Sequence, residues 1–547
     1  MVRRVVVIAL VAAACSGRGP QAVGSQPSWR GKTQVSGPPR PVTFAPSSQP
    51  AVRYNEPVAP PPPSALGNAI VAAVRDAAVH ANTAVPVADA RLFRACAELA
   101  QIVPEEGVMA YSLIEFALQR NGIIEPSPNL IVVWGDLDSP QAIVDQLQPR
   151  LAEILADGAT GRVGIGAAKR MPDGTGAVVF ALQASGVTTS PIPRAVEAGG
   201  TFALDAAVDA HYRDPEVFVT RLDGSVERVE LRPGKPGWFR AQIRCGASTG
   251  KQQIEITASD AQGSTVLANF PVWCGAEPPP SLTVEPSIDD GPVADPTEAE
   301  HRVLALVNRD RQAAGLPPLL WDERVAEVAR GHSQEMRRTK VVAHISPTTG
   351  NAADRVRAAK IKTPVVLENV ARAYGIGEAH QGLMNSPGHR ANVMSSAATH
   401  IGIGVVLGEE VSGRREIFIT QVFMRVPPKV DPARAAEAIG ARLTAIRGVG
   451  TSPALGGIAQ DFAAALAAGQ TREQASASLK RRVDALAGQY ARIGSVITAA
   501  TDLDTLDAAS LLGDTHPDDI GVGIGLGTHP ELGEGAIFIV VLLATRR

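Results

Sequence analysis

The chain is poor in cysteine and in long apolar runs, and it has no large excess of charge of either sign. Four cysteines in 547 residues cannot build a disulfide-dense scaffold. No run of ~20 apolar residues occurs, so the sequence predicts no membrane-spanning helix. Lysine plus arginine (52) nearly balance aspartate plus glutamate (55), which argues against a nucleic-acid-binding protein. Hydrophobic residues (45%) suffice for several cores, and the length predicts three or four domains of roughly 150 residues each.

The amino terminus has the form of a secretory signal peptide. Two arginines precede the apolar run 5–14, which is too short to span a membrane. The run ends in the sequence AAAC, and two interpretations stay open. Either a peptidase cleaves after the alanines, or the segment resembles a bacterial lipobox, in which Cys15 is acylated and becomes the mature amino terminus. Both predict an extracytoplasmic protein, secreted or membrane-anchored, and two or more acyl chains would hold it at the membrane surface.

Proline-rich stretches predict breaks between domains. Residues 16–66 contain a run of four consecutive prolines, and such a segment is expected to form a disordered tether. A second break is expected at residues 276–296.

The segment 190–275 reads as strands, because apolar and polar residues alternate and an Asp-Gly turn follows one apolar run. Its length predicts a β-sandwich of immunoglobulin-like size. Cys245 and Cys274 lie in its last strands, and we expect a disulfide between them in an oxidising compartment, with two free buried thiols as the alternative. Cys96 has the helical spacing of a buried core residue.

Six of the ten histidines lie between His301 and His400, and this concentration makes the region the place to look for a site. His332 falls on the apolar face of an expected helix and is predicted to belong to the core. We expect His400 at a sheet edge and His380 in solvent.

Five segments of this region occur in an order that is similar to a known family. They read LVNRDRQAAGLPPLLWDERVAEVARGHSQEM, AHISP, ENVA, MNSPGHRANVM and THIGIGVV. Together they resemble the CAP superfamily of cysteine-rich secretory proteins, antigen 5 and pathogenesis-related 1 proteins, and most closely its SCP-like extracellular members in bacteria. The resemblance implies an α-β-α sandwich, in which a twisted antiparallel sheet lies between helical layers beside a central groove.

The resemblance also implies candidate site residues. The family's groove carries two histidines and two acidic residues. By motif position, His344 and His389 match the histidines and Glu368 matches the first acid. The second acid is replaced by Ser386, so the family's set of four is incomplete here.

The residues themselves leave several kinds of chemistry open. His344, His389 and Glu368 are ligands that a divalent cation such as Zn²⁺ accepts, with a fourth position left open. The same groups could carry out acid–base chemistry, because histidine titrates near neutral pH. Ser386 and Ser346 lie close to the histidines in sequence and are candidate ligand-binding residues, but neither is a convincing nucleophile. Structural roles, metal or ligand binding, and catalysis remain alternatives.

Residues 400–423, 519–542 and 162–182 share a pattern of a glycine-containing strand, a polar loop and an apolar returning strand. We interpret them as parts of three copies of one fold. Pro128 and Ser495 stand opposite Glu368 in our alignment, so the outer copies are expected to lack the site.

These observations predict a multi-domain protein with CAP domains and one immunoglobulin-like β-sandwich. Its function is expected to be binding of a lipid, glycan or envelope protein in the groove around His344, Glu368 and His389. The alternative is a metal-assisted hydrolase that acts on peptides or on the envelope, and the residues favour binding over catalysis. The expected boundaries are signal peptide 1–15, tether 16–66, degenerate CAP-like domain 67–187, β-sandwich 190–275, linker 276–296, CAP domain 297–428 and a second degenerate domain 429–547.

Overall fold

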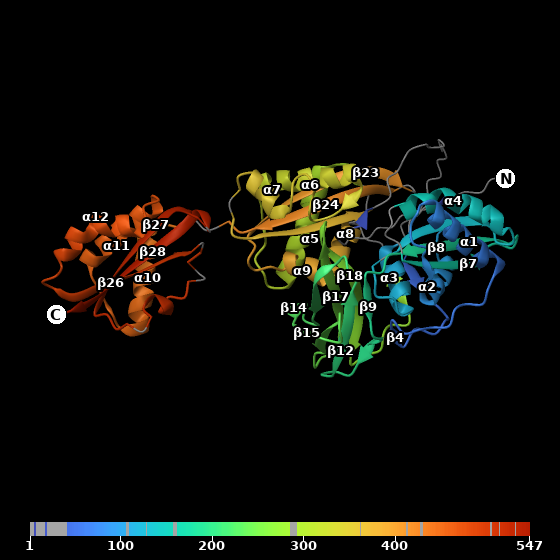
Figure 1. Ribbon diagram of the computed structural model, residues 1–547, viewed down its shortest axis with the longest axis horizontal. Helices are drawn as coiled ribbons and strands as arrows, with labels where there is room; N and C mark the ends of the chain where they lie inside the picture. The colour runs from blue at the N-terminus through green and yellow to red at the C-terminus, as the bar shows by residue number, and fades with distance from the viewer. Residues whose placement is uncertain are drawn as a thin grey trace. The chain divides into compact units, whose positions relative to one another are not determined.

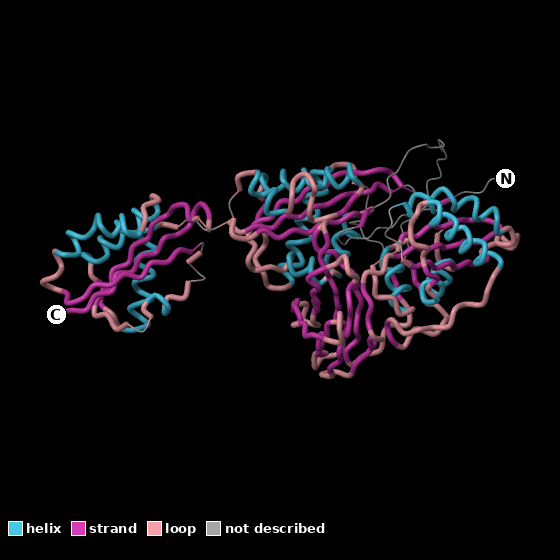
Figure 2. Tube along the Cα trace, in the orientation of Figure 1, coloured by secondary structure: helices cyan, strands magenta, loops and turns pink. Residues whose placement is uncertain are grey.

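The computed structural model (Figures 1 and 2) describes residues 5–6, 17–18 and 41–547 apart from 105–108, 127, 157–160, 285–292, 362, 412–413, 427–429, 501, 504–505, 514 and 531. Cys15 and most of the predicted signal peptide therefore lie outside the described residues. Contacts divide the chain into one unit of residues 1–359 with 367–423 and another of residues 360–366 with 424–547. Among the described residues, no helix is long and apolar enough to cross a membrane.

The first unit begins with a five-stranded sheet between two helical layers. Its strand order is β1-β6-β8-β7-β5. One core lies between this sheet and α2 and α3, and a second lies between its other face and α1 and α4. The elements are α1 (Ala65–His80), α2 (Ala90–Ala100), α3 (Tyr111–Arg120), α4 (Pro140–Ala156), β1 (Val5–Val6), β5 (Val87–Ala88), β6 (Asn129–Asp136), β7 (Arg162–Lys169) and β8 (Thr175–Gln183).

The proline-rich segment that precedes α1 packs onto the fold. Two short ladders hold it, β3 (Val42–Phe44) against β19 (Leu282–Val284) and β4 (Arg53–Tyr54) against β10 (Ile192–Pro193). Phe44 and Tyr54 are buried, and the Tyr54 hydroxyl donates to the Pro271 carbonyl at 2.7 Å. The prediction of a disordered tether is therefore wrong for residues 41–66, since two short strands pair there and two aromatic side chains supply burial. Within the expected linker 276–296, residues 282–284 form β19.

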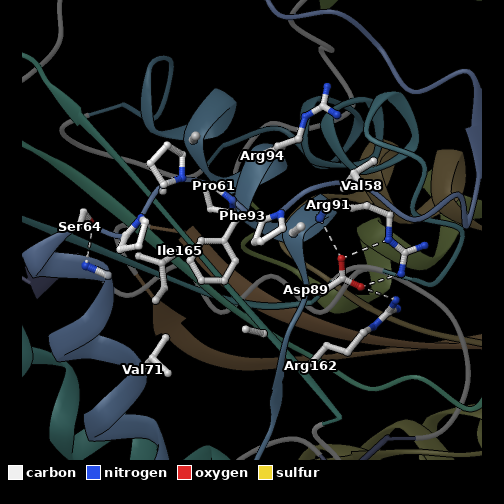
Figure 3. A pocket seen from close by; sticks show the side chains of 18 of the residues that line it. Val58, Pro61, Ser64, Val71, Asp89, Arg91, Phe93, Arg94, Arg162 and Ile165 are labelled. Carbon is white, nitrogen blue, oxygen red and sulfur yellow. Dashed lines mark hydrogen bonds and ion pairs between the residues drawn. The ribbon is translucent and has the colours of Figure 1, made fainter.

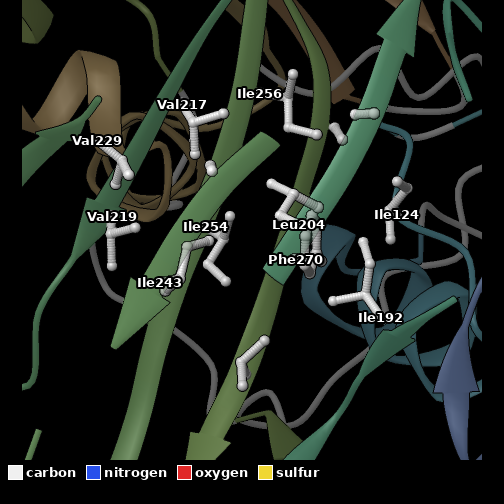
Figure 4. Packing of buried hydrophobic residues seen from close by; sticks show 14 of the residues in the cluster. Ile124, Ile192, Leu204, Val217, Val219, Val229, Ile243, Ile254, Ile256 and Phe270 are labelled. Carbon is white, nitrogen blue, oxygen red and sulfur yellow. The ribbon is translucent and has the colours of Figure 1, made fainter. Parts of the chain in front are cut away.

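Two sheets that share one apolar core follow (Figure 4). Residues from both sheets interdigitate there, including Leu204, Val219, Ile243 and Ile254. Their orders are β11-β18-β17-β13-β14 and β15-β16-β12-β9. The strands are β9 (Val187–Thr189), β11 (Ala195–Val196), β12 (Thr201–Val208), β13 (Arg213–Thr220), β14 (Val226–Val229), β15 (Leu231–Pro233), β16 (Phe239–Arg244), β17 (Gly250–Asp260) and β18 (Gly263–Cys274). We refer to this part as the sandwich; its likeness to an immunoglobulin domain stays a prediction.

A disulfide joins Cys245 to Cys274, as expected, with their Cα atoms 5.5 Å apart. Cys96 is a buried free thiol, as expected, and burial raises its pKa. We expect the double substitution Cys245→Ala/Cys274→Ala to lower the free energy of unfolding of the sandwich by roughly 3 kcal/mol, because the unfolded chain loses a loop constraint. Denaturant titration with and without dithiothreitol measures the difference. Reductant should destabilise the wild type and leave the double variant unchanged; equal midpoints for wild type and variant would contradict the expectation.

The rest of the first unit holds a four-stranded sheet of order β20-β23-β24-β22. One face packs on α5, α8 and α9, while Met336 of α6 packs on the other. The elements are α5 (Pro296–Ala313), β20 (Leu320–Trp321), α6 (Glu323–Thr339), β21 (Val341–Val342), α7 (Ala352–Ala358), β22 (Val366–Ala373), α8 (Ile376–Asn385), α9 (Pro387–Val393), β23 (His400–Val411) and β24 (Arg414–Met424). The remaining short strand, β2 (Gly17–Arg18), pairs with β21.

The second unit, taken by itself, has the same internal strand pattern. Its sheet runs β25-β27-β28-β26, and the short β25 is parallel to β27 just as β20 is to β23 and β5 to β7. Its elements are α10 (Pro432–Arg447), β25 (Gly450–Thr451), α11 (Pro453–Ala467), α12 (Arg472–Asp484), β26 (Tyr490–Ala500), a 3₁₀ helix (Ala509–Leu511), β27 (Asp519–His529) and β28 (Gly533–Arg546).

Glycines explain how one helix lies directly on the hairpin in each of these three sheets. A Cβ added at Gly404 would stand 2.2 Å from the Arg330 nitrogen of α6. The equivalent contact is 2.1 Å at Gly523 against α11 and 2.0 Å at Gly166 against α2. The glycine pattern of the sequence thus corresponds to close helix-on-strand packing.

Candidate functional site

His344 and Glu368 form the first half of the site. His344 lies in the loop after β21, and Glu368 lies in β22; the His344 Nδ1 and Glu368 Oε1 atoms are 3.0 Å apart. Arg355 of α7 donates to the other carboxylate oxygen. Burial alone would raise the pKa of Glu368, but the hydrogen bond with His344 and the charge of Arg355 outweigh it and hold this pKa below its usual value. Glu368 is therefore a buried anion that orients the His344 ring.

His389 and Ser386 form the second half. Ser386 links α8 to α9, and its Oγ lies 2.6 Å from Nδ1 of His389. The rings of His344 and His389 are stacked with centroids 6.3 Å apart and planes inclined by 27°. His389 is only 5% exposed, whereas 19% of the His344 side chain is exposed. The structure thus brings four of the five predicted site residues together, and His344 is the more accessible imidazole.

Ser346, the fifth predicted residue, stabilises a turn. Its hydroxyl donates to Glu335 Oε1 at 2.6 Å and accepts from the Thr348 and Thr349 amides at 3.0 and 2.9 Å. These bonds close the loop that follows His344. Ser346 therefore shapes the loop rather than presenting a hydroxyl beside the imidazoles.

The remaining histidines have structural contacts. His332 is buried, as predicted, and one of its ring nitrogens lies 2.8 Å from the Ala343 carbonyl beside His344. His400 begins β23 opposite Leu320, at the junction with the short outer strand. The expectation for His380 is wrong: it is 5% exposed, and Nε2 lies 2.8 Å from an Asp310 carboxylate oxygen. That acidic partner on α5 makes burial of the imidazole tolerable.

The predicted metal ion would need one ring nitrogen from each of the two imidazoles. An imidazole binds a metal through a ring nitrogen whose lone pair lies in the ring plane, and the two ring centroids are 6.3 Å apart with their planes inclined by 27°. Over the described part of the chain, no group of three or more His, Cys, Asp or Glu side chains is placed to hold a metal. The predicted Zn²⁺ site at His344, His389 and Glu368 remains a prediction without support from this geometry.

The sandwich contributes a residue that the sequence did not point to. Glu255 of β17 is 0% exposed, and its carboxylate accepts from the Ser386 hydroxyl and, at 2.8 Å, from the Gly388 amide. Alternation in β17 predicts that Glu255 faces away from the sandwich core, between Ile254 and Ile256. It does so, but the outward face is covered by α9. A buried partner more than a hundred residues away leaves no local sequence signal.

The sandwich also touches the His344 loop. The Ile345 amide donates to the Gln262 carbonyl at 2.9 Å, and the next residue, Gly263, has φ +108°. A Cβ at Gly263 would stand 3.0 Å from the His344 Cβ atom. Both histidine loops are thus braced from the same domain.

This contact predicts that Gly263→Ala displaces His344. We expect this substitution to lower the free energy of unfolding by about 1–2 kcal/mol more than Gly237→Ala does. Alanine is strained at both positions because φ is positive, but only at Gly263 does the added Cβ meet another atom within 4 Å. Thermal unfolding measures the two losses, and the NMR resonances of His344 report its displacement. Equal losses with unmoved His344 resonances would contradict the prediction.

A separate cavity of about 1180 Å³ lies in the first domain (Figure 3). Its wall is formed by the proline-rich segment 57–63 together with α1, α2 and β7. The side chains that line it include Val58, Pro61, Val71, Phe93 and Ile165. The Asp89 carboxylate at its edge is paired with Arg91 and Arg162. This carboxylate is therefore already neutralised by the protein, and the lining identifies no ligand.

A match to a known protein family covers the region around His344. A family model described as "Cysteine-rich secretory protein family" (CAP) matches residues 304–423. The uncharacterized membrane protein YlbC of Bacillus subtilis is 38% identical over 189 residues, which are 34% of this chain and 53% of that protein. The uncharacterized protein YkwD of the same organism is 38% identical over 108 residues, 20% of this chain and 42% of YkwD. The chain thus spans about half the length, or less, of these curated relatives.

Solved structures give a weaker likeness. An extracellular protein with an SCP domain from Bacillus anthracis has 22% identity and a TM-score of 0.22, with 36% of this chain and 66% of that chain covered. An outer surface protein from Borrelia burgdorferi has 16% identity and a TM-score of 0.22, with 24% and 96% covered. TM-scores of this size carry no argument about the chain as a whole.

Proposed function

Since residues 304–423 of this chain form a CAP domain of the cysteine-rich secretory protein family, we propose that the protein works outside the cytoplasm as a binding module. Its ligand, a lipid, glycan or envelope protein, contacts the CAP domain at His344. The location is supported by the amino-terminal sequence and by the similarity to YlbC, which is described as a membrane protein.

The observation that carries this proposal is the fixed orientation of a partly exposed imidazole. An ionised carboxylate only accepts hydrogen bonds, so the contact with Glu368 requires a proton on Nδ1 of His344. The lone pair of the neutral ring is then on Nε2. Arg355 holds the carboxylate from its other side. A ring held in this way loses little side-chain entropy when a ligand arrives, which favours binding.

The metal-assisted hydrolase remains the alternative, and a serine-based hydrolase at this site has less support. In a serine triad the base lies between the nucleophile and the acid. Here Ser386 lies between Glu255 and His389, and its hydroxyl donates to the acid rather than to the imidazole. The order is wrong for activating Ser386 as a nucleophile.

The proposal is tested with the full chain and two defined probes, peptidoglycan sacculi and vesicles of phosphatidylglycerol and phosphatidylethanolamine. We expect the wild type to bind one of them and His344→Ala to bind it about tenfold more weakly, a difference of about 1.4 kcal/mol. His301→Ala is the matched control, because His301 is an exposed histidine of the same domain. Binding that is unchanged in His344→Ala would refute the proposed contact. Hydrolysis of either probe that requires His344 would favour the enzyme instead.

We propose further that the two outer domains are copies of the CAP fold that lack the site. The shared strand order and the shared glycine contacts support this interpretation. The positions aligned with Glu368, Pro128 and Ser495, cannot supply its carboxylate. Packing, rather than chemistry, accounts for what the three have in common.

A further inference from the structure

We propose that Glu255 of the sandwich is a positioning residue for His389: through Ser386 it fixes the proton of the neutral His389 ring on Nδ1. The site would then be a composite of two domains, with the CAP domain supplying the imidazoles and the sandwich setting the orientation of one of them. This inference concerns how the site is built and does not depend on the proposed ligand-binding function.

The first step is the placement of the Glu255 carboxylate. It is fully buried, and its two oxygens have different donors, the Ser386 hydroxyl and the Gly388 amide. These donors lie on either side of the turn that enters α9 and carries His389. A buried carboxylate needs such donors, because burial without them would be strongly unfavourable. Glu255 is thus fixed by the same segment that it orients.

The second step follows the protons. A hydroxyl has one hydrogen, and Ser386 gives it to Glu255, which as a carboxylate can only accept. The 2.6 Å contact between Ser386 Oγ and His389 Nδ1 can then be a hydrogen bond only if Nδ1 carries the hydrogen. In the neutral ring the lone pair is therefore on Nε2.

The third step is the rigidity of the contact between the domains. Three other hydrogen bonds join the sandwich to the same region: Asn269 to the Asn385 carbonyl at 3.2 Å, Arg390 to the Gly224 carbonyl at 2.9 Å, and the Ile345 amide to the Gln262 carbonyl at 2.9 Å. These bonds involve the segments on both sides of Glu255. The carboxylate is therefore held against α9 by a surface, not by a single contact.

The test is a tautomer measurement on the full-length protein with ¹⁵N-labelled histidine. At a pH where His389 is neutral, the wild type should show a protonated Nδ1 and an unprotonated Nε2. Glu255→Gln should reverse this. The amide oxygen of glutamine must stay on the Gly388 N–H, so its NH₂ group faces Ser386 and donates to it. The serine hydrogen then turns to His389, Nδ1 becomes an acceptor, and the proton moves to Nε2.

Two variants separate this role from a general loss of structure. Glu216→Gln on β13 is the matched control, because Glu216 pairs at the surface with Arg228, and it should leave the His389 tautomer unchanged. Ser386→Ala should remove the preference for Nδ1–H. A wild-type His389 protonated on Nε2 would overturn the inference even if Glu255→Gln fails to fold. A folded Glu255→Gln that keeps the wild-type tautomer would overturn it as well.

Discussion

Gly404→Ala should destabilise the CAP domain by on the order of 4 kcal/mol, at the upper end of the range for overpacking. The added methyl group would stand 2.2 Å from the Arg330 nitrogen and 2.4 Å from the Ala329 carbonyl carbon, both backbone atoms of α6. Backbone cannot turn aside as a side chain can, so the whole helix must move away from β23. Denaturant unfolding monitored by tryptophan fluorescence measures the loss.

Gly331→Ala is the control, and its expected effect has the opposite sign. Gly331 lies within the same helix, is exposed, and has nothing within 4 Å of its would-be Cβ. Alanine there should stabilise by about 0.5–1 kcal/mol, because glycine is a poor helix former. If Gly404→Ala were as harmless as Gly331→Ala, the close packing of α6 on β23 would be incorrect.

Arg355→Met should lower the free energy of unfolding by about 3–5 kcal/mol, because it leaves the buried Glu368 anion without its guanidinium partner. Methionine keeps much of the apolar length of the side chain, so the change removes mainly charge and hydrogen bonds. The His344 ring should also lose its fixed orientation, which NMR would detect as exchange broadening. Thermal and denaturant unfolding give the energetic part.

Arg357→Ala provides the comparison on the same helix. Arg357 pairs with Asp354 at an exposed position and should matter by less than about 1 kcal/mol. Similar losses of unfolding free energy in Arg355→Met and Arg357→Ala would contradict the expectation that the buried ion pair contributes more than the exposed one.

The wild type and the Arg355→Met variant should also differ in how much stability they lose at acidic pH. In the wild type the pKa of Glu368 is below its value of 4.5 in a free side chain, so its contribution to stability is present above that pH and is lost as the pH falls through the folded-state pKa. Without the charge of Arg355, less offsets the effect of burial, so the pKa of Glu368 rises. The loss of stability that protonation of Glu368 causes at low pH therefore becomes smaller.

Much of the fold could be predicted because local patterns and packing agree. The glycines of residues 400–404 indicate close packing or a bend of the strand, and in the structure the backbone of α6 packs closely at Gly402 and Gly404. The spacing of His332 places it in the core, where it is found. The disulfide between Cys245 and Cys274, expected from their place in the last strands of the sandwich and from an oxidising compartment, is confirmed.

What could not be predicted depends on partners distant in sequence. The sequence around His380 is typical of an exposed helix position, and only the fold shows that Asp310 lies beside it. Glu255 has the pattern of an outward strand residue, and only the docking of α9 on the sandwich makes it part of the site. The family pattern indicated that an acid was missing where Ser386 stands, but it could not indicate that a neighbouring domain brings a carboxylate to that serine.

The early strand β3 has a practical consequence for truncation. A fragment that starts at the first long helix would lose Phe44 and Tyr54, whose rings fill two different cores. Each core would be left with a void the size of a phenyl ring, and β19 would lose its pairing partner. Domain dissection of this protein should therefore retain residues from 41 onward, even though that stretch has the composition of a dispensable linker.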